Sequence, residues 1–225
     1  MNTLLNGSLP GEEVLSPSEE VALNTIPEAK SSAKGVSVRY VKSGGKGWYV
    51  FRASYNREVM AANDLIESGI YAYVVQRYVM TEKDGKRRKT LKSLIPNIVF
   101  AYIDAQSANK FVKDFNAQRG SFLSFYYNHF AKDTYGNNPP LVVPDDEMEN
   151  FIKATATNSE HLKSVIPEKC RFLGKEVEIV RGYYKGVRGL VARVAGQQCV
   201  VVSLANGEFQ ISTEYIPTAY MREIR

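Results

Sequence analysis

The stretch EIVRGYYKGVRGLVARV, residues 178–194, decides how the C-terminal part of this chain folds. Runs of alternating β-branched residues flank two glycine-centred turns, Arg181-Gly182 and Lys185-Gly186, and four bases punctuate the stretch. A phosphate-binding loop, a catalytic loop and a turn between barrel strands are the three interpretations to weigh.

The residue types and their spacing exclude the first two interpretations. A phosphate-binding loop leads into a helix and closes with a Lys-Ser or Lys-Thr pair, and neither follows the glycines here. A catalytic loop needs an acid, a base or a nucleophile, and no His, Asp, Glu or Cys lies within the turns. The stretch is therefore predicted to be a binding-module turn, formed by Gly182, Lys185, Gly186, Arg188 and Gly189.

Every pattern after residue 168 is of the β type. Short alternating or apolar runs, separated by glycine-containing turns, lie at residues 175–180, 188–194, 197–204, 207–212 and 220–224. Strands this short stay soluble only if the sheet protects its edges by closing on itself. The sequence therefore predicts a small all-β barrel over residues 168–225.

The preceding part of the chain alternates strand patterns with amphipathic helix patterns. The apolar and aromatic run Gly47–Ala53 predicts a first strand, and Gly69 ends the helix pattern that follows it. The order β-α-β-β-α-β-α predicts an α+β domain, residues 46–156, with helices packed on a mixed sheet. Strands are expected at 47–53, 70–82, 94–104 and 121–128, helices at 57–68, 108–115 and from 144, and a basic hairpin tip at 83–89.

Charge is divided unevenly along the chain. Residues 1–29 hold five acids and no Lys or Arg, so the remainder holds all 29 bases and 19 of the 24 acids. Such a basic body favours an acidic partner, nucleic acid first, although the same charge also serves solubility alone. Residues 1–45 are expected to be a mostly disordered acidic head, and residues 157–167 a flexible linker.

Several classes of protein are not supported by the sequence. No apolar run approaches the ~20 residues of a membrane span, and the N-terminus lacks the features of a secretory signal. A cytoplasmic location, no membrane partner and reduced thiols at Cys170 and Cys199 are therefore expected. His129 and His161 have no metal-ligand cluster around them, so no metal, no cofactor and no enzymatic activity are expected.

Four segments carry a family resemblance. GKEVEIVRGYYKGVRGLVARV resembles the KOW motif, and WYVFRASYNREVMAANDLIESGI resembles the opening strand and helix of the NusG N-terminal domain. KSLIPNIVFAYID resembles that family's Phe-Pro-Gly-Tyr strand, with Ile95, Asn97 and Ile98 in place of Phe, Gly and Tyr. LVVPDDEMENFI resembles the segment that closes the domain. Asn97 and the long head resemble specialised paralogues, the RfaH type or the polysaccharide-operon (UpxY-like) antiterminators.

The resemblance implies a non-enzymatic transcription antitermination or elongation factor. Its N-terminal domain would bind the clamp of RNA polymerase through an apolar patch and hold the clamp shut, which suppresses pausing or termination. The implied polymerase-binding residues are Ile98, Phe100, Phe122 and Phe125. Strand residues in a helix-covered sheet are apolar too, so the alternative is that these residues are core.

The bases of the expected hairpin tip and the start of the first helix are the implied nucleic-acid contacts. They would approach upstream or non-template DNA. The alternative interpretation of the basic segment is a solvated loop that contacts no DNA. These residues are Asn56, Arg57, Lys86, Arg87, Arg88 and Lys89. The alternative function is that of a ribosome- or RNA-associated KOW protein. In a transcription factor as well, the KOW domain would bind the ribosome or another factor.

RfaH-type proteins include chains whose KOW segment folds as a helical hairpin over the polymerase site. Here that segment is rich in β-branched residues, which fit a pleated sheet better than a helix. Five glycines would each cost a helix interior about 1 kcal/mol relative to alanine. We therefore expect a β-barrel in the free protein, flexibly linked, with the docking patch not masked by helices.

Overall fold

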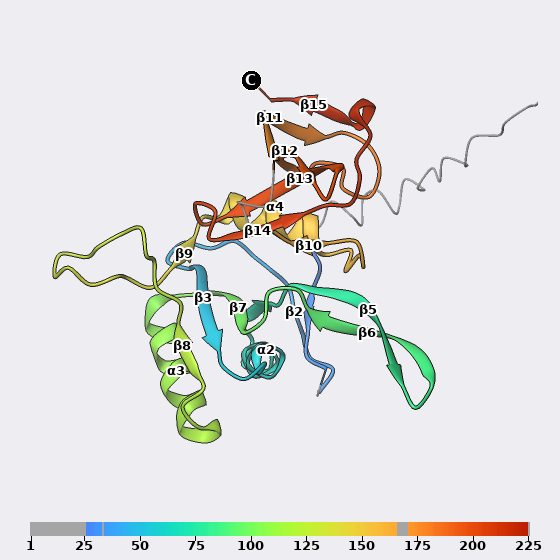
Figure 1. The fold of residues 1–225 in the computed structure, drawn as a ribbon. Coiled ribbons are helices and arrows are strands. Elements are labelled where there is room, and N and C mark those ends of the chain that lie inside the picture. Colours follow the sequence, from blue (N-terminus) through green and yellow to red (C-terminus); the bar gives the residue numbers. More distant parts are fainter. Residues whose placement is uncertain (1–25, 33, 166–170, 225) are drawn as a thin grey trace, which may run out of the picture.

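The computed structural model describes residues 26–32, 34–165 and 171–224. Figure 1 shows an N-terminal α+β domain and a C-terminal domain built only of strands and one short 3-10 turn. Most of the expected head, residues 1–25, lies outside the described part. Among the described helices, none combines the length and apolar character that crossing a bilayer requires.

The N-terminal domain is built on a sheet with the strand order β4-β7-β3-β8. The strands are β4 (Tyr71–Tyr73), β7 (Ile98–Ile103), β3 (Gly47–Ala53) and β8 (Leu123–Phe125), and β9 (Val142–Val143) also pairs with β3. All these described pairs are antiparallel, so the expected mixed sheet is not what forms. All six residues of β7 are buried, which explains why the sequence IVFAYI is apolar without alternation.

Helices cover both faces of this sheet (Figure 1). On one face lie α2 (Glu58–Glu67) and α3 (Ala105–Arg119), where Phe51 contacts Phe111 with 6.4 Å between ring centroids. On the other lies α4 (Asp145–Thr155), which opens with three acids that complement the helix dipole. Asp104 caps α3 by accepting a 2.8 Å hydrogen bond from the Ser107 amide.

The long strand expected at residues 70–82 is two strands. After β4 the chain leaves the central sheet and continues as β5 (Gln76–Lys83), which pairs with β6 (Lys86–Ser93) in a separate two-stranded sheet. Their turn is Asp84-Gly85, with both residues at positive φ. The bases expected at a hairpin tip therefore run along β6, because backbone pairing with β5 extends through all eight residues of each strand.

Residues 26–45 differ from the disordered head that was expected. A small hairpin of β1 (Ala29–Lys30) and β2 (Ser37–Val38) packs near α2, and the Tyr71 hydroxyl donates to the Pro27 carbonyl at 2.7 Å. The Tyr40 ring then joins an aromatic cluster on the α4 face, with Trp48, Tyr71 and Tyr102. Burial of one large aromatic side chain thus anchors a segment whose polar composition suggests disorder.

The C-terminal domain is a six-stranded antiparallel sheet with the order β10-β14-β13-β12-β11-β15. Its strands are β10 (Lys163–Ser164), β11 (Arg171–Ile179), β12 (Arg188–Val194), β13 (Gln197–Leu204), β14 (Phe209–Ser212) and β15 (Met221–Glu223). The five strand patterns of the sequence are confirmed. The expected linker adds a sixth, because β10 pairs with β14.

Two glycines of the opening stretch have definite structural reasons. Gly186 adopts φ +84°, and its amide closes the turn on the Ile179 carbonyl at 2.7 Å. A Cβ at Gly189 would lie 2.4 Å from the Val201 carbonyl oxygen, so the two strands could not approach with any larger residue there. The stretch is therefore a strand–turn–strand element, as its pattern indicates.

Candidate docking face and basic hairpin

Phe100 lies at the centre of the N-terminal sheet on the face covered by α4. It pairs in register with Val50 of β3 and Tyr73 of β4, and it is fully buried. Its ring contacts Phe151 of α4 at 6.1 Å between centroids and Phe209 of β14 at 5.6 Å, nearly edge-on at 82°. The residue predicted to dock on a partner is thus covered by the protein's own C-terminal domain.

The four predicted docking residues do not form one patch. Ile98 shares the face of Phe100 by strand alternation and is also buried. Phe125 lies opposite Phe51 in the β3–β8 register and contacts its ring at 5.3 Å, on the face covered by α3. Phe122 directly precedes β8. Its side chain is half-buried, with its ring against Arg57 and Tyr55. Only Ile98 and Phe100 remain as one candidate docking face.

Tyr126 and Phe209 complete the contact between the two domains. The two rings lie 5.4 Å apart, and the Tyr126 hydroxyl donates a hydrogen bond to the Glu208 carboxylate. Partial burial, followed by that carboxylate, raises the pKa of Tyr126 to about 12. Neither aromatic residue stood out in the sequence, because each looks like ordinary strand core; only the two domains together show their role.

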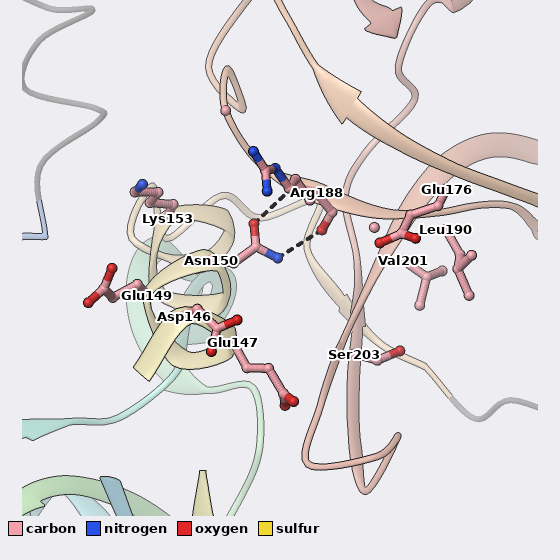
Figure 2. A pocket seen from close by; sticks show the side chains of 12 residues that line it. Asp146, Glu147, Glu149, Asn150, Lys153, Glu176, Arg188, Leu190, Val201 and Ser203 are labelled. Carbon is pink, nitrogen blue, oxygen red and sulfur yellow. Dashed lines mark hydrogen bonds between the residues drawn. The ribbon is translucent and has the colours of Figure 1, made fainter. Parts of the chain in front are cut away.

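Helix α4 also holds the C-terminal domain through polar contacts (Figure 2). The Asn150 amide nitrogen donates to the Arg188 carbonyl and its amide oxygen accepts from the Arg188 N–H, both at 2.8 Å. Further along, Glu147 accepts from the Ala205 N–H at 3.0 Å. These contacts border a groove of about 650 Å³ between α4 and strands β12 and β13. Backbone groups of the β domain are thus recognised in a fixed register.

The predicted turn residues lie in the β11–β12 connection. Arg188 begins β12, and its guanidinium lies 3.9 Å from Glu178. The turn is closed by a 3.1 Å hydrogen bond from the Lys185 amide to the Gly182 carbonyl. Tyr184 is buried within it, and this burial raises the pKa of its phenol to about 12. The turn is rigidly built, and Arg188 belongs to the domain contact rather than to an open binding loop.

The basic hairpin has two chemically different faces. Cross-strand pairing puts Lys83 opposite Lys86, Thr81 opposite Arg88 and Arg77 opposite Lys92. Residues directly opposite in an antiparallel pair point to the same side. One face of the β5–β6 ribbon, here named the basic face, therefore carries Arg77, Lys83, Lys86, Arg88 and Lys92 without an acid. Arg87 and Lys89 of the predicted DNA-binding set lie on the opposite face.

The loop before α2 brings together the other predicted DNA contacts. Tyr55 and Asn56 both adopt positive φ, and the Asn56 amide donates to the Asn97 side-chain oxygen at 2.8 Å. The Arg57 guanidinium stacks 3.5 Å from the centroid of the Phe122 ring, and Tyr55 meets that ring edge-on while remaining 78% exposed. Strained backbone at non-glycine residues is typical of functional sites. Sequence reasoning missed Tyr55.

A comparison with protein families found a match within the N-terminal domain. Residues 46–152 match the NusG family. The matching family model is described as transcription termination factor nusG, and the matched residues run from the start of β3 into α4. A search of the curated proteins found no match. The NusG-type domain thus contains both the Phe100 face and the basic hairpin, and the C-terminal β domain lies outside the match.

The NusG-type domain and its partner domain show no arrangement typical of catalysis with a metal. Within residues 26–32, 34–165 and 171–224, no three His, Cys, Asp or Glu side chains gather where they could share a metal ion. The candidate features that remain are a covered apolar sheet face, a basic ribbon and an aromatic loop with positive φ angles.

Proposed function

We propose that this protein is a transcription elongation or antitermination factor that binds RNA polymerase through its NusG-type domain. The observation that carries the proposal is the match over residues 46–152, because the NusG family comprises non-enzymatic factors that act in transcription termination and elongation. A cytoplasmic site of action follows from that role. A purely ribosomal or RNA-associated KOW protein would not need this domain.

The docking step uses the face of the central sheet around Ile98 and Phe100. In the described structure Phe209 covers this face, so docking requires the C-terminal domain to move away. The contact between the domains includes polar hydrogen bonds at Asn150 and Glu147, and such contacts separate more readily than a purely apolar core. The aromatic surface that Phe209 covers, beside Phe151 of α4, then becomes available to an apolar partner surface.

Suppression of pausing follows from differential affinity. A factor that bridges the polymerase clamp binds the closed state of the clamp more tightly than the open state, and this shifts the population towards the closed state. Because pausing and termination need the open state, both are disfavoured. No chemical step is required of the protein.

Nucleic-acid contacts are assigned to two places on the NusG-type domain. The bases along β6 favour phosphate contacts with upstream DNA, which are electrostatic and independent of sequence. The Tyr55 loop favours an exposed non-template strand, because an exposed ring beside a guanidinium is a stacking platform for a base. The proposed nucleic-acid-binding residues are those predicted from the sequence: Asn56, Arg57, Lys86, Arg87, Arg88 and Lys89.

The finer assignment is to the specialised RfaH or polysaccharide-operon (UpxY-like) type. Asn97 supports it, because its positive φ of 65° and its hydrogen bond to the Asn56 amide shape the Tyr55 loop where the family has glycine. The C-terminal β domain is assigned as a KOW barrel, whose partner is the ribosome or another factor. Surface-polysaccharide operons are the proposed targets.

The proposal is tested by binding and by transcription. Full-length protein is mixed separately with purified core RNA polymerase and with ribosomes, and each mixture is resolved by sedimentation. Binding to core polymerase, together with shorter pauses in a single-round transcription assay, is expected. Binding to ribosomes alone would instead select the KOW-protein alternative.

A further inference from the structure

The basic face of the β5–β6 ribbon has no counter-charge on the ribbon itself. It carries five bases and no acid: Arg77, Lys83, Lys86, Arg88 and Lys92. Lys83 lies directly opposite Lys86, and like charges in that position repel each other. Apart from the partly buried Arg77 these bases are exposed, and none of the five forms an ion pair with another residue in the described part of the chain. Figure 1 shows the ribbon projecting from the body of the domain, so this positive charge is open to a partner.

The sequence before Ile26 has the opposite charge. Residues 1–25, here named the acidic segment, contain four acids and no Lys or Arg. The acids form two pairs, a first acid pair at Glu12 and Glu13 and a second acid pair at Glu19 and Glu20. Each pair leads into a valine and then a leucine, as EEVL at 12–15 and EEVAL at 19–23. The acidic segment therefore carries the same acidic unit twice, with a charge complementary to that of the basic face.

The spacing of the two acid pairs matches the spacing of charge along the ribbon. Lys83 and Lys86 form the ribbon tip, and Arg77 and Lys92, which also lie opposite each other, form the ribbon base. Along β6 these two positions are six residues apart, or about 20 Å in a strand. The two acid pairs are seven residues apart in the sequence, which an extended chain spans with about 23 Å. One acid pair can therefore lie at each end of the ribbon.

The acidic segment joins the described part of the chain beside the ribbon base. Pro27 and Gln76, the first residue of β5, line the same cleft of about 320 Å³. Six residues separate Glu20 from Ile26, a reach of at most about 20 Å, so the second acid pair is close enough to the ribbon base. The first acid pair has a reach of more than about 40 Å, which exceeds the length of an eight-residue strand. Attachment to the same chain also gives a weak contact a high effective concentration.

We propose that the acidic segment docks on the basic face of the β5–β6 ribbon of its own chain and occupies the positions that DNA phosphates would take. The second acid pair lies at the ribbon base and the first acid pair at the ribbon tip. The docking follows from charge and reach, whereas its competition with DNA rests on the proposed function. A tethered acidic segment opposes weak binding to any DNA, and it yields to DNA that the polymerase holds beside the ribbon at high local concentration.

The experiment removes the charge of each acid pair separately in the full-length chain. The two test variants are Glu12→Gln/Glu13→Gln and Glu19→Gln/Glu20→Gln. The matched control, Asp114→Asn/Glu160→Gln, changes the net charge by the same amount at exposed acids on α3 and after α4. Backbone amide chemical shifts of the ribbon are recorded without DNA at low salt, where exposed charges are least screened. Affinity for a 30-base-pair DNA duplex is then measured by fluorescence anisotropy at the same salt.

Each test variant is expected to shift the amide resonances at the end of the ribbon that its acid pair contacts, and the control to leave them unchanged. Each test variant should also bind the duplex about fivefold more tightly than wild type, as the loss of two competing exposed ion pairs would allow. Ribbon shifts that stay the same in both test variants would overturn the docking. Shift changes that disappear on dilution would place the acidic segment on a second copy of the chain and overturn the contact within one chain.

The duplex measurement separates this inference from the proposed function. A gain in duplex affinity as large in the control as in the test variants would reduce the effect to net charge and refute the competition. If neither wild type nor any variant binds the duplex, the proposed DNA contact of the ribbon fails, and the competition fails with it. The amide shifts, which need no DNA, then still support or overturn the docking itself.

Discussion

Phe209 of the C-terminal domain lies edge-on against Phe100 of the NusG-type domain, with 5.6 Å between their ring centroids. The aromatic residue best placed to dock on a partner is thereby occupied within the chain. The residue of the C-terminal domain that covers Phe100 lies in a strand, β14, and not in a helix.

Phe209→Ala is therefore expected to strengthen binding to core polymerase. The substitution removes most of the aromatic burial between the domains, worth about 2 kcal/mol, so the open arrangement gains a factor of roughly 30. Titration of core polymerase with labelled full-length protein measures the change. Tyr215→Ala, at an exposed aromatic of the same domain, is the control. Weaker binding by Phe209→Ala than by the control would contradict the masking role.

Alkaline pH is expected to weaken the same contact through Tyr126. Its pKa is raised to about 12, so the neutral phenol, which donates to Glu208, is favoured in the folded state. The stabilisation is fully present below the ordinary pKa of 10.0 and is lost as the pH rises through about 12. NMR line shapes of the two domains, followed from pH 9 upward, report their separation.

Tyr126→Phe separates this effect from that of the other buried tyrosines. The variant lacks the titrating hydroxyl, so its domain contact is expected to be weaker at neutral pH and less sensitive above pH 10. Tyr184, whose pKa is also about 12, titrates in both proteins and serves as the internal reference. An alkaline transition identical in variant and wild type would show that Tyr126 does not control the contact.

Asn150→Ala is expected to loosen the edge of the domain contact. Both side-chain hydrogen bonds to the Arg188 backbone are lost, at a cost of about 1 kcal/mol at this partly exposed site. Hydrogen exchange of the Arg188 amide should accelerate several-fold as its acceptor disappears. Lys153→Ala, on the same helix and groove, is the matched control and should leave this exchange rate unchanged.

Replacing Arg87, Arg88 and Lys89 with alanine should weaken DNA binding in a salt-dependent way. Each lost phosphate contact lowers the slope of log K against log salt by about 0.9. Of the three bases only Arg88 lies on the basic face, so a slope smaller by about 1 is expected. Fluorescence anisotropy with a DNA duplex between 50 and 200 mM salt measures it. Lys110→Ala/Lys113→Ala on α3 is the control. An unchanged slope would remove these bases from the DNA interface.

The elements that burial dictates were predictable from the sequence. Strand β3, the acidic start of α4 and the strands of the C-terminal domain have patterns that few other structures explain. β6 was not, because KRRKTLKS has the composition of a solvated loop and becomes a strand only through its backbone pairing with β5. The composition of an exposed strand does not show which strand it pairs with.

The candidate site was predictable only in part, because some of its features depend on contacts between residues that are distant in the sequence. Ile98 and Phe100 follow from alternation along one strand, but the covering residue Phe209 is distant in sequence and looks like ordinary core. Tyr55 required the positive φ values of its loop, which non-glycine residues rarely adopt and which sequence patterns do not show. Contacts between domains and strained loops are tertiary properties.

The final prediction is that the C-terminal domain keeps its strands when it leaves the Phe100 face. β12 and β13 are rich in valine, which loses side-chain freedom in a helix. Gly189 approaches the Val201 carbonyl closely enough to exclude any side chain, so the pairing of these two strands requires glycine there. Secondary chemical shifts of residues 187–204 should therefore be of the β type in both the wild-type chain and Phe209→Ala. Continuous helical shifts across those residues in either protein would show a change of fold on release, and the domain would then be a structural switch instead of a rigid cover.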